Sequence, residues 1–257
     1  MARLPRIDLA GFHHVINRGV ERREIFIDKE DYDEFLTLLC QQCVKYEVDV
    51  HSYCLMSNHY HLLIETHQEN LSKFMRAINA QYAAYFNRKY KRVGHLWQGR
   101  FKSWFVTDEA YLYTLIKYIE YNPLKAKMIN TLSDYRYSSY NSFVNNNRPI
   151  SCLTQSVMFA QFQTIDDRVE FFDSWYDEDV LKEIKKASSL VVSSVTQKEL
   201  PLQELQKLFA SYTTKIERNE KILKAVELGY SQNAIANVLK VTQGTSSHVL
   251  GKKRDKK

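Results

Sequence analysis

Two histidines separated by one residue mark the part of this sequence where chemistry is first expected. His59 and His61 lie in a run of aromatic and branched residues, Ser57 to Thr66, which predicts a β-strand. Side chains alternate along a strand, so both imidazoles would point to the same face. Imidazole is a ligand for several divalent first-row metals. The pattern therefore predicts part of a metal site, which needs further ligands from elsewhere in the chain.

The segment from Asp108 to Asn122 offers those ligands. It has an acidic start, no internal Gly or Pro, and Pro123 directly after it, which together predict a helix. Tyr118 and Asn122 are four residues apart and would share a helix face. If that face meets the histidine strand, Asn122 can supply an oxygen ligand and Tyr118 a phenol beside the metal, a potential nucleophile. Tyr111 lies on nearly the same face two turns earlier and is the reserve nucleophile.

Three longer stretches of sequence contain these residues. They are residues 53–63 (YCLMSNHYHLL), 95–103 (HLWQGRFKS) and 117–126 (KYIEYNPLKA). Together they resemble the single-tyrosine HUH transposases, and within them the branch called REP-associated tyrosine transposases. The resemblance covers roughly residues 11–140. It does not extend to the C-terminal part of the chain.

The resemblance implies a cofactor, a partner and a reaction. A Mg²⁺ or Mn²⁺ ion would be held by His59, His61 and Asn122 and would polarise a scissile phosphate. The partner would be single-stranded or hairpin DNA. Tyr118 would attack phosphorus, leaving a 5′-phosphotyrosine and a free 3′-hydroxyl. Since the phosphotyrosine keeps the energy of the broken ester, rejoining would need no ATP.

Two other functions remain open. A non-catalytic DNA-binding regulator would use the histidines only as structural residues. A metal-dependent phosphodiesterase would use water as its nucleophile, so it would still cleave DNA after Tyr118→Phe and would form no covalent adduct.

The charge pattern indicates a nucleic-acid partner. The net charge is +6, and no acidic residue occurs between Asn70 and Thr107, where Lys and Arg are frequent. Such a stretch attracts phosphate backbones. A solvated helix face with a basic loop is the alternative, although some acidic residues would then be expected. The expected DNA contacts in this half of the chain are Arg18, Arg76, Arg88, Lys89, Arg92, Trp97, Arg100 and Lys102.

The order of the predicted elements indicates the fold class. Strands are expected over residues 12–18, 48–55, 57–66 and 100–106, and helices over 28–46, 71–90 and 108–122. The order strand, helix, strand, strand, helix, strand matches an α+β, ferredoxin-like antiparallel sheet with packed helices. His14, in the first strand, either supports the metal site, faces DNA, or is a buried structural histidine.

Three domains are expected: the catalytic domain over residues 1–145, an acidic helical connector and linker over 146–198, and a small all-α unit over 199–257. The run from Ala234 to Leu239, with the Ser/Thr-rich helix after it, resembles a helix-turn-helix, which places its second helix in the major groove of duplex DNA. A packing or dimerisation bundle is the alternative. Both a monomer and a homodimer are compatible with the sequence. The expected DNA contacts of this unit are Gln243, Thr245, Ser246 and His248.

Cysteine use and hydropathy suggest an ordinary cytoplasmic protein. Cys40 and Cys43 form a Cys-x-x-Cys, but no second pair completes a zinc site. We expect both to be packing residues of a helix. No apolar run approaches the ~20 residues that span a bilayer, and the N-terminus lacks a signal-peptide core, so we expect a soluble protein.

Overall fold

The computed structural model describes residues 8–106, 110–145, 149–174, 202–211 and 214–227, together with 235, 238 and 239. The chain divides into two compact units, Met1–Val191 and Val192–Lys257, and each is described by itself. Among the helices in these ranges, none combines the length and the apolar character required to span a membrane.

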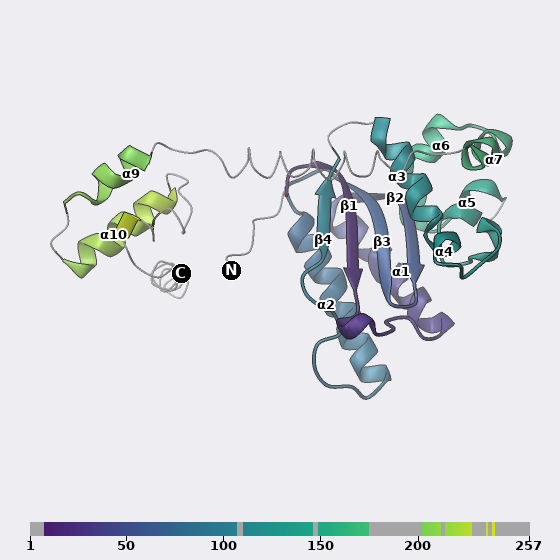
Figure 1. Cartoon of the computed structure of the whole chain (residues 1–257), viewed down its shortest axis with the longest axis horizontal. Helices are drawn as coiled ribbons and strands as arrows, with labels where there is room; N and C mark the ends of the chain where they lie inside the picture. Colours follow the sequence, from purple (N-terminus) through teal and green to yellow (C-terminus); the bar gives the residue numbers. More distant parts are fainter. Residues whose placement is uncertain are drawn as a thin grey trace. The chain divides into compact units, whose positions relative to one another are not determined.

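The first unit is built on a four-stranded antiparallel sheet (Figure 1). Strands β1 (Gly11–Arg18), β2 (Val48–Met56), β3 (His59–Thr66) and β4 (Lys102–Phe105) lie in the order β2-β3-β1-β4. Helix α1 (Lys29–Tyr46) connects β1 to β2, and α2 (Leu71–Lys89) connects β3 to β4. This confirms the α+β, ferredoxin-like class predicted from the sequence.

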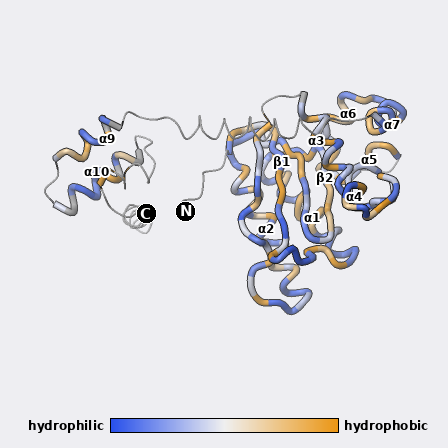
Figure 2. The backbone as a smooth tube through the Cα atoms, viewed as in Figure 1, coloured by the Kyte–Doolittle hydropathy of each residue, from blue (hydrophilic) through white to orange (hydrophobic). Residues whose placement is uncertain are grey.

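Helices α1 and α2 pack on one face of the sheet. Helix α1 begins at a capping box in which Asp28 and Asp31 each accept the other's backbone N–H. Tyr60 points from β3 toward both helices. Its ring centroid lies 4.9 Å from that of Phe35, and its hydroxyl donates to Asn79 Oδ1 at 2.9 Å. The strands contain short hydrophobic stretches (Figure 2), and Val15, Leu62 and Ile64 from them are buried in the main core.

Helix α3 (Ala110–Glu120) packs against β2 and β3. The sequence predicts one helix that extends to Asn122, but α3 ends at Glu120 and Asn122 begins a separate short helix, α4 (Asn122–Lys125). The reason is Pro123, which has no N–H to donate to the Ile119 carbonyl. The Asn122 side-chain amide donates instead to the carbonyls of Tyr118 (2.7 Å) and Ile119 (3.4 Å).

The segment after α4 wraps around the same core. It contains η2 (Leu132–Asp134), α5 (Tyr140–Val144), η3 (Ser151–Leu153), α6 (Val157–Gln161) and α7 (Ile165–Asp173). Leu153, Met158 and Phe172 are buried in the main core. Residues 149–174 therefore pack as part of the first unit, where the sequence suggested a separate connector.

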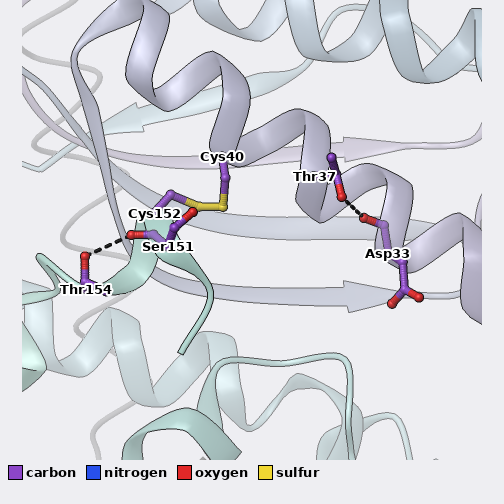
Figure 3. Close-up of a disulfide and its surroundings, with 6 residues drawn as sticks. All are labelled: Asp33, Thr37, Cys40, Ser151, Cys152 and Thr154. Atoms are coloured by element: carbon purple, nitrogen blue, oxygen red, sulfur yellow. Dashed lines mark hydrogen bonds between the residues drawn. A yellow bond between two sulfur atoms is a disulfide. The ribbon is translucent and has the colours of Figure 1, made fainter. Parts of the chain in front are cut away.

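A disulfide joins this wrapping segment to α1. Cys40 is bonded to Cys152, with the two Cα atoms 5.0 Å apart (Figure 3). The expectation that Cys40 is only a packing residue is therefore wrong, because its partner lies far along the sequence in η3. Cys43 is a buried free thiol, as expected for a packing residue, and burial raises its pKa to about 12.

The second unit contains α9 (Leu202–Phe209) and α10 (Lys215–Glu227). Helix α10 begins at Thr214, whose hydroxyl accepts the Glu217 N–H. A small core is formed by Leu205, Phe209, Ile222, Ala225 and Ile235. The four predicted DNA contacts Gln243, Thr245, Ser246 and His248 lie outside the described residues, so the helix-turn-helix stays a prediction.

Candidate active site

The two histidines of β3 face the same side of the sheet as α3. The antiparallel register places His61 opposite Ile16 and His59 opposite Arg18. Their ring centroids are 5.2 Å apart, and His61 is only 4% exposed. Both line a cavity of about 600 Å³, whose other lining residues are Ile16, Asn17, Arg18, Arg22, Asn58, Gln98, Gly99, Arg100, Lys102 and Trp104. We call this the histidine cavity.

Hydrogen bonds orient the His59 ring. Its Nδ1 lies 2.6 Å from Asn58 Oδ1, and the Asn58 amide nitrogen donates to the Arg22 carbonyl at 3.1 Å. Since the Asn58 oxygen faces the ring, Nδ1 carries the proton and Nε2 carries the lone pair. Burial and the positive charge of Arg18 lower the pKa of His59 to about 4. The ring is therefore neutral at pH 7, the form that binds metal ions.

His61 is held by a third histidine. Its Nδ1 lies 3.1 Å from Nε2 of His14, and the two rings stack with centroids 5.4 Å apart. The Tyr118 ring of α3 meets both rings edge-on, at 5.8 Å from His14 and 5.7 Å from His61. His14 thus supports the metal-binding candidate, one of the alternatives left open by the sequence. The structure brings Tyr118 directly beside His61.

A positive charge lies next to the candidate nucleophile. The Lys125 ammonium is 5.4 Å from the centre of the Tyr118 ring. A cation here suits the approach of a phosphate, which binds most strongly to charged donors. Tyr111, the reserve nucleophile, is partly buried against the main core.

Asn122 does not line the histidine cavity. Its amide nitrogen bonds to backbone carbonyls in its own segment, as described above, and it is partly buried. For its oxygen to join the two histidines on an ion, the side chain would have to turn away from Tyr118 O. Asn122 therefore lies one turn beyond the nucleophile, but outside the group of side chains that the cavity brings together.

A second cavity of about 710 Å³ adjoins the first. The two share Asn17, Gln98, Gly99 and Arg100. Together they form a basic groove, which we define by the four cations predicted from the sequence that line it, Arg18, Arg76, Arg100 and Lys102. Trp97 lines the second cavity, while its indole N–H donates to the Asn79 carbonyl at 2.9 Å and its ring packs on Tyr60. Five of the predicted DNA contacts thus lie along one groove.

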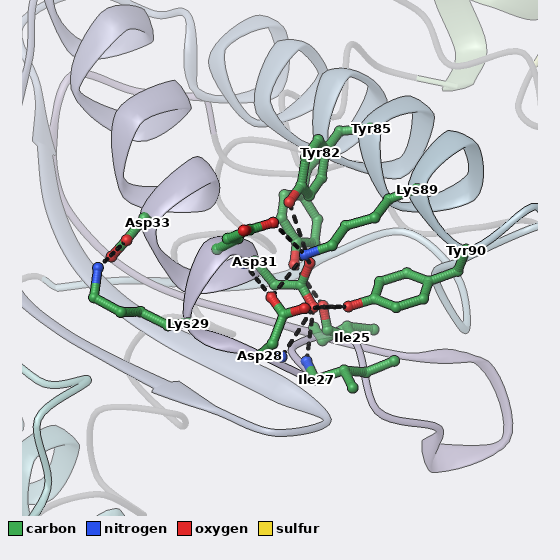
Figure 4. Close-up of polar contacts among 11 residues, drawn as sticks. Ile25, Ile27, Asp28, Lys29, Asp31, Asp33, Tyr82, Tyr85, Lys89 and Tyr90 are labelled. Carbon is green, nitrogen blue, oxygen red and sulfur yellow. Dashed lines mark hydrogen bonds and ion pairs between the residues drawn. The ribbon is translucent and has the colours of Figure 1, made fainter.

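Lys89 has a different environment from the one the sequence suggests. Its ammonium contacts the carboxylates of Asp28 (2.7 Å), Asp31 (3.0 Å) and Glu30 (3.2 Å), all at the start of α1 (Figure 4). Asp31 is fully buried, so it requires a compensating cation. Lys89 holds α2 to α1, and we remove it from the set of DNA contacts.

Arg88 and Arg92 also lie away from the groove. Arg88 is exposed at the end of α2. The Arg92 guanidinium stacks on the Phe86 ring, with its carbon 5.6 Å from the ring centre. Neither residue lines the two cavities.

Two residues that line the groove, Gln98 and Arg22, were not predicted from the sequence. Gln98 accepts a hydrogen bond from Arg18 Nε at 2.9 Å and so positions that arginine. Arg22 lines the histidine cavity from the short helix η1 (Val20–Arg22). Gln98 lies inside one of the characteristic stretches and could have been singled out. Arg22 lies in a charged turn and carries no such signal.

Known proteins are similar to this part of the chain in sequence or structure. Residues 11–122 match the family model described as "Transposase IS200 like". A Haemophilus influenzae protein named "Putative REP-associated tyrosine transposase" is 27% identical over 122 residues, which cover 43% of this chain and 69% of that protein. A solved structure of a REP-associated tyrosine transposase bound to a REP hairpin matches with a TM-score of 0.47 and 17% identity, over 56% of this chain and 84% of that chain.

Proposed function

Residues 11–122 of this chain match the family model of IS200-like transposases, and from this premise we propose that the protein cleaves and rejoins single-stranded DNA at folded hairpin elements through a phosphotyrosine. The observation that carries the proposal is the contact of Tyr118 with His61. The Tyr118 ring lies 5.7 Å from the ring of His61, a proposed metal ligand, and His61 lines a cavity that also contains Arg18, Arg100 and Lys102.

The residues present fit a divalent ion. His59 is neutral and presents Nε2, and His61 Nδ1 is occupied by His14, so an ion on His61 would be held by Nε2 as well. Asn122 is the proposed third ligand, after a turn of its side chain. A Mg²⁺ or Mn²⁺ ion held there would polarise the scissile phosphate.

Tyr118 performs the proposed transesterification. Its hydroxyl oxygen forms a bond to phosphorus, and the bond from phosphorus to the 3′-oxygen breaks. The phenol loses its proton to solvent, and the departing 3′-oxygen gains one. The products are a 5′-phosphotyrosine and a free 3′-hydroxyl. Attack by a 3′-hydroxyl on the phosphotyrosine reverses the step and joins DNA ends without ATP.

The basic groove is the proposed binding surface for the strand. Arg18, Arg76, Arg100 and Lys102 would pair with successive phosphates. The ring centroid of Trp104 lies 5.5 Å from that of His14, and Trp104 lines the histidine cavity. It therefore offers a ring on which an unpaired base can stack near the proposed nucleophile. We also propose that the second unit binds duplex DNA, through Gln243, Thr245, Ser246 and His248. The proposed site of action is the cytoplasm.

The test uses the full chain, Mn²⁺ and labelled hairpin DNA with single-stranded flanks. We expect a covalent adduct on a denaturing gel, with the DNA attached to Tyr118 by peptide mass analysis. Tyr118→Phe should abolish the adduct and keep DNA binding, and His59→Ala should also abolish it. Tyr111→Phe, which removes a hydroxyl from the same helix, is the matched control and should keep the adduct.

Two outcomes would contradict the proposal. Cleavage that persists in Tyr118→Phe without an adduct would identify a nuclease that uses water. DNA binding without any cleavage, across a broad set of hairpin sequences, would identify a non-catalytic regulator.

A further inference from the structure

A second group of metal-ligand side chains lies at the far end of β3. Strand β3 begins at His59, and His67 follows its last residue, which puts the two imidazoles on the order of 26 Å apart along the strand. Asp49 of β2 lies directly opposite Glu65 of β3. One ligand atom from each of Asp49, Glu65 and His67 lies within 4.8 Å of the other two.

Two carboxylates, those of Asp49 and Glu65, lie opposite each other on neighbouring strands. Like charges directly opposite each other in an antiparallel pair are destabilising. In the described part of the chain, the ion-pair partners of Asp49 and Glu65 are both histidines: His67 Nε2 lies 2.7 Å from Asp49 Oδ2, and His51 Nε2 lies 3.3 Å from Glu65 Oε2. No Lys or Arg is paired with either carboxylate there.

His51 provides an independent sign that Glu65 is positioned for a ligand. The sheet contains a β-bulge between Val50 and Ser52, which inserts His51 as an extra residue and re-aims its side chain. His51 is 2% exposed, and its Nδ1 accepts the Val157 N–H at 3.1 Å. Its Nε2 therefore carries the proton. That atom is buried, faces the Glu65 carboxylate and has no hydrogen-bond partner of good geometry.

A buried imidazole N–H directed at a carboxylate is the usual support for a carboxylate metal ligand. If Glu65 bound an ion through one oxygen and shifted slightly, its other oxygen could complete the bond with His51.

The cluster also adjoins a cavity that an ion could enter. Asp49 and His67 line a cavity of about 230 Å³, together with Glu47 and Gln155. Of the described residues that line it, none is Lys or Arg. His67 is exposed, so its ring can turn to admit an ion between itself and Asp49.

We propose that Asp49, Glu65 and His67 bind one divalent transition-metal ion, with Zn²⁺ and Mn²⁺ as the ions best suited to two carboxylates and an imidazole. The ion would tie β2 to β3 at the end of the sheet remote from Tyr118, so its role is structural. The site is separate from the one formed by His59 and His61, and the inference does not depend on the proposed reaction.

The experiment removes the other histidine site first. In full-length His59→Ala/His61→Ala protein, Zn²⁺ binding is measured by equilibrium dialysis, and the melting temperature is measured with and without Zn²⁺. We expect a single ion per chain and a higher melting temperature with Zn²⁺. Adding His67→Gln, an exposed change that leaves the core intact, should weaken binding by about tenfold or more. Asp49→Asn should act in the same direction.

The matched control is Glu69→Gln, which removes an exposed carboxylate two residues after His67 and should leave Zn²⁺ affinity unchanged. Co²⁺ in place of Zn²⁺ should give no thiolate charge-transfer band, since no cysteine is a proposed ligand. The proposal is overturned if the background protein binds no ion, if His67→Gln and Asp49→Asn both bind as tightly as the background, or if a thiolate band appears and is lost in Cys43→Ser.

Discussion

The Nε2 atom of His14 lies 3.1 Å from Nδ1 of His61. Both rings are buried, on the face of the sheet that meets Tyr118 of α3. Strands β1 and β3 place them there, because His14 is opposite Leu63 and Ile16 is opposite His61 in the register. An ion on His61 Nε2 requires the proton to be on His61 Nδ1. That N–H can donate a hydrogen bond to His14 Nε2. In the proposed site His14 would therefore orient the ligand His61 without contacting the ion itself.

This relationship predicts the effect of removing His14. His14→Ala should lower Mn²⁺ affinity by about 10- to 100-fold, because the His61 ring loses the partner that fixes its orientation and proton position. Titration of Mn²⁺ followed by electron paramagnetic resonance measures this. His13→Ala is the control, since His13 is equally buried on the other face of β1 and bonds to the Leu9 carbonyl. An equal loss in both variants would point to general damage to the strand.

Arg100 should contribute to binding of the DNA backbone. It lines both cavities of the basic groove, so Arg100→Ala should weaken binding of single-stranded DNA and reduce the slope of log K against log salt by about 0.7. Binding at several salt concentrations, followed by fluorescence anisotropy, gives the slope. Lys45→Ala, at an exposed lysine of α1, should leave it unchanged. A normal slope in Arg100→Ala would remove this residue from the interface.

Lys89 should matter for stability and leave DNA binding intact. Lys89→Met leaves the buried Asp31 carboxylate without its closest cation and should lower the free energy of unfolding by about 2 kcal/mol. Urea denaturation measures the loss, and DNA affinity is measured on the same protein below the transition. Lys91→Met, at an exposed neighbour, should be neutral for stability. Weaker DNA binding with unchanged stability would return Lys89 to the interface.

Glu120 should make stability depend on pH. It is 1% exposed, and burial raises its pKa to about 7, although the hydroxyls of Ser52 and Ser139 and the Tyr140 N–H all bond to it. Because the pKa of Glu120 is higher in the folded protein than the ordinary value of 4.5, the protonated carboxyl group favours the folded state. This contribution to the free energy of unfolding is fully present below pH 4.5. It is lost as the pH rises to about 7, by up to about 3 kcal/mol.

Glu120→Gln tests this dependence, because glutamine keeps the shape of the neutral carboxyl group. Thermal unfolding followed by circular dichroism, between about pH 5 and 8, should show a flatter stability profile for the variant than for the native chain. Parallel profiles would mean that Glu120 is ionised in the folded protein throughout.

Features set by neighbours in the sequence could be predicted, and those set by distant partners could not. The Asp28 cap, the shared face of His59 and His61, and the order of strands and helices depend on short-range patterns, and the ferredoxin-like class followed from them. The contact of His14 with His61 depends on strand register. The pairing of Lys89 with the start of α1 depends on how two helices pack.

The segment that contains α3 and Tyr118 shows the same contrast between features that could and could not be predicted. The existence of the helix and its apolar faces could be predicted, but the break before Asn122 could not, although Pro123 was visible in the sequence. Predicting that break would have required knowing that the Asn122 side-chain amide bonds to the Tyr118 carbonyl and to the Ile119 carbonyl, which the missing N–H of Pro123 leaves without its helical partner. The same bonds explain why Asn122 does not line the histidine cavity.

The disulfide between Cys40 and Cys152 has a consequence for the connectivity of the protein. The residues that it joins are separated by 112 positions in the sequence, and His59, His61, Tyr118 and Asn122 all lie between them. The proposed metal ligands and the proposed nucleophile are thus contained in one covalently closed ring, while His14 and Arg18 of β1 lie outside it. A single cut of the main chain between His61 and Tyr118 would leave the two halves of the site linked, and they would separate on a denaturing gel only after reduction.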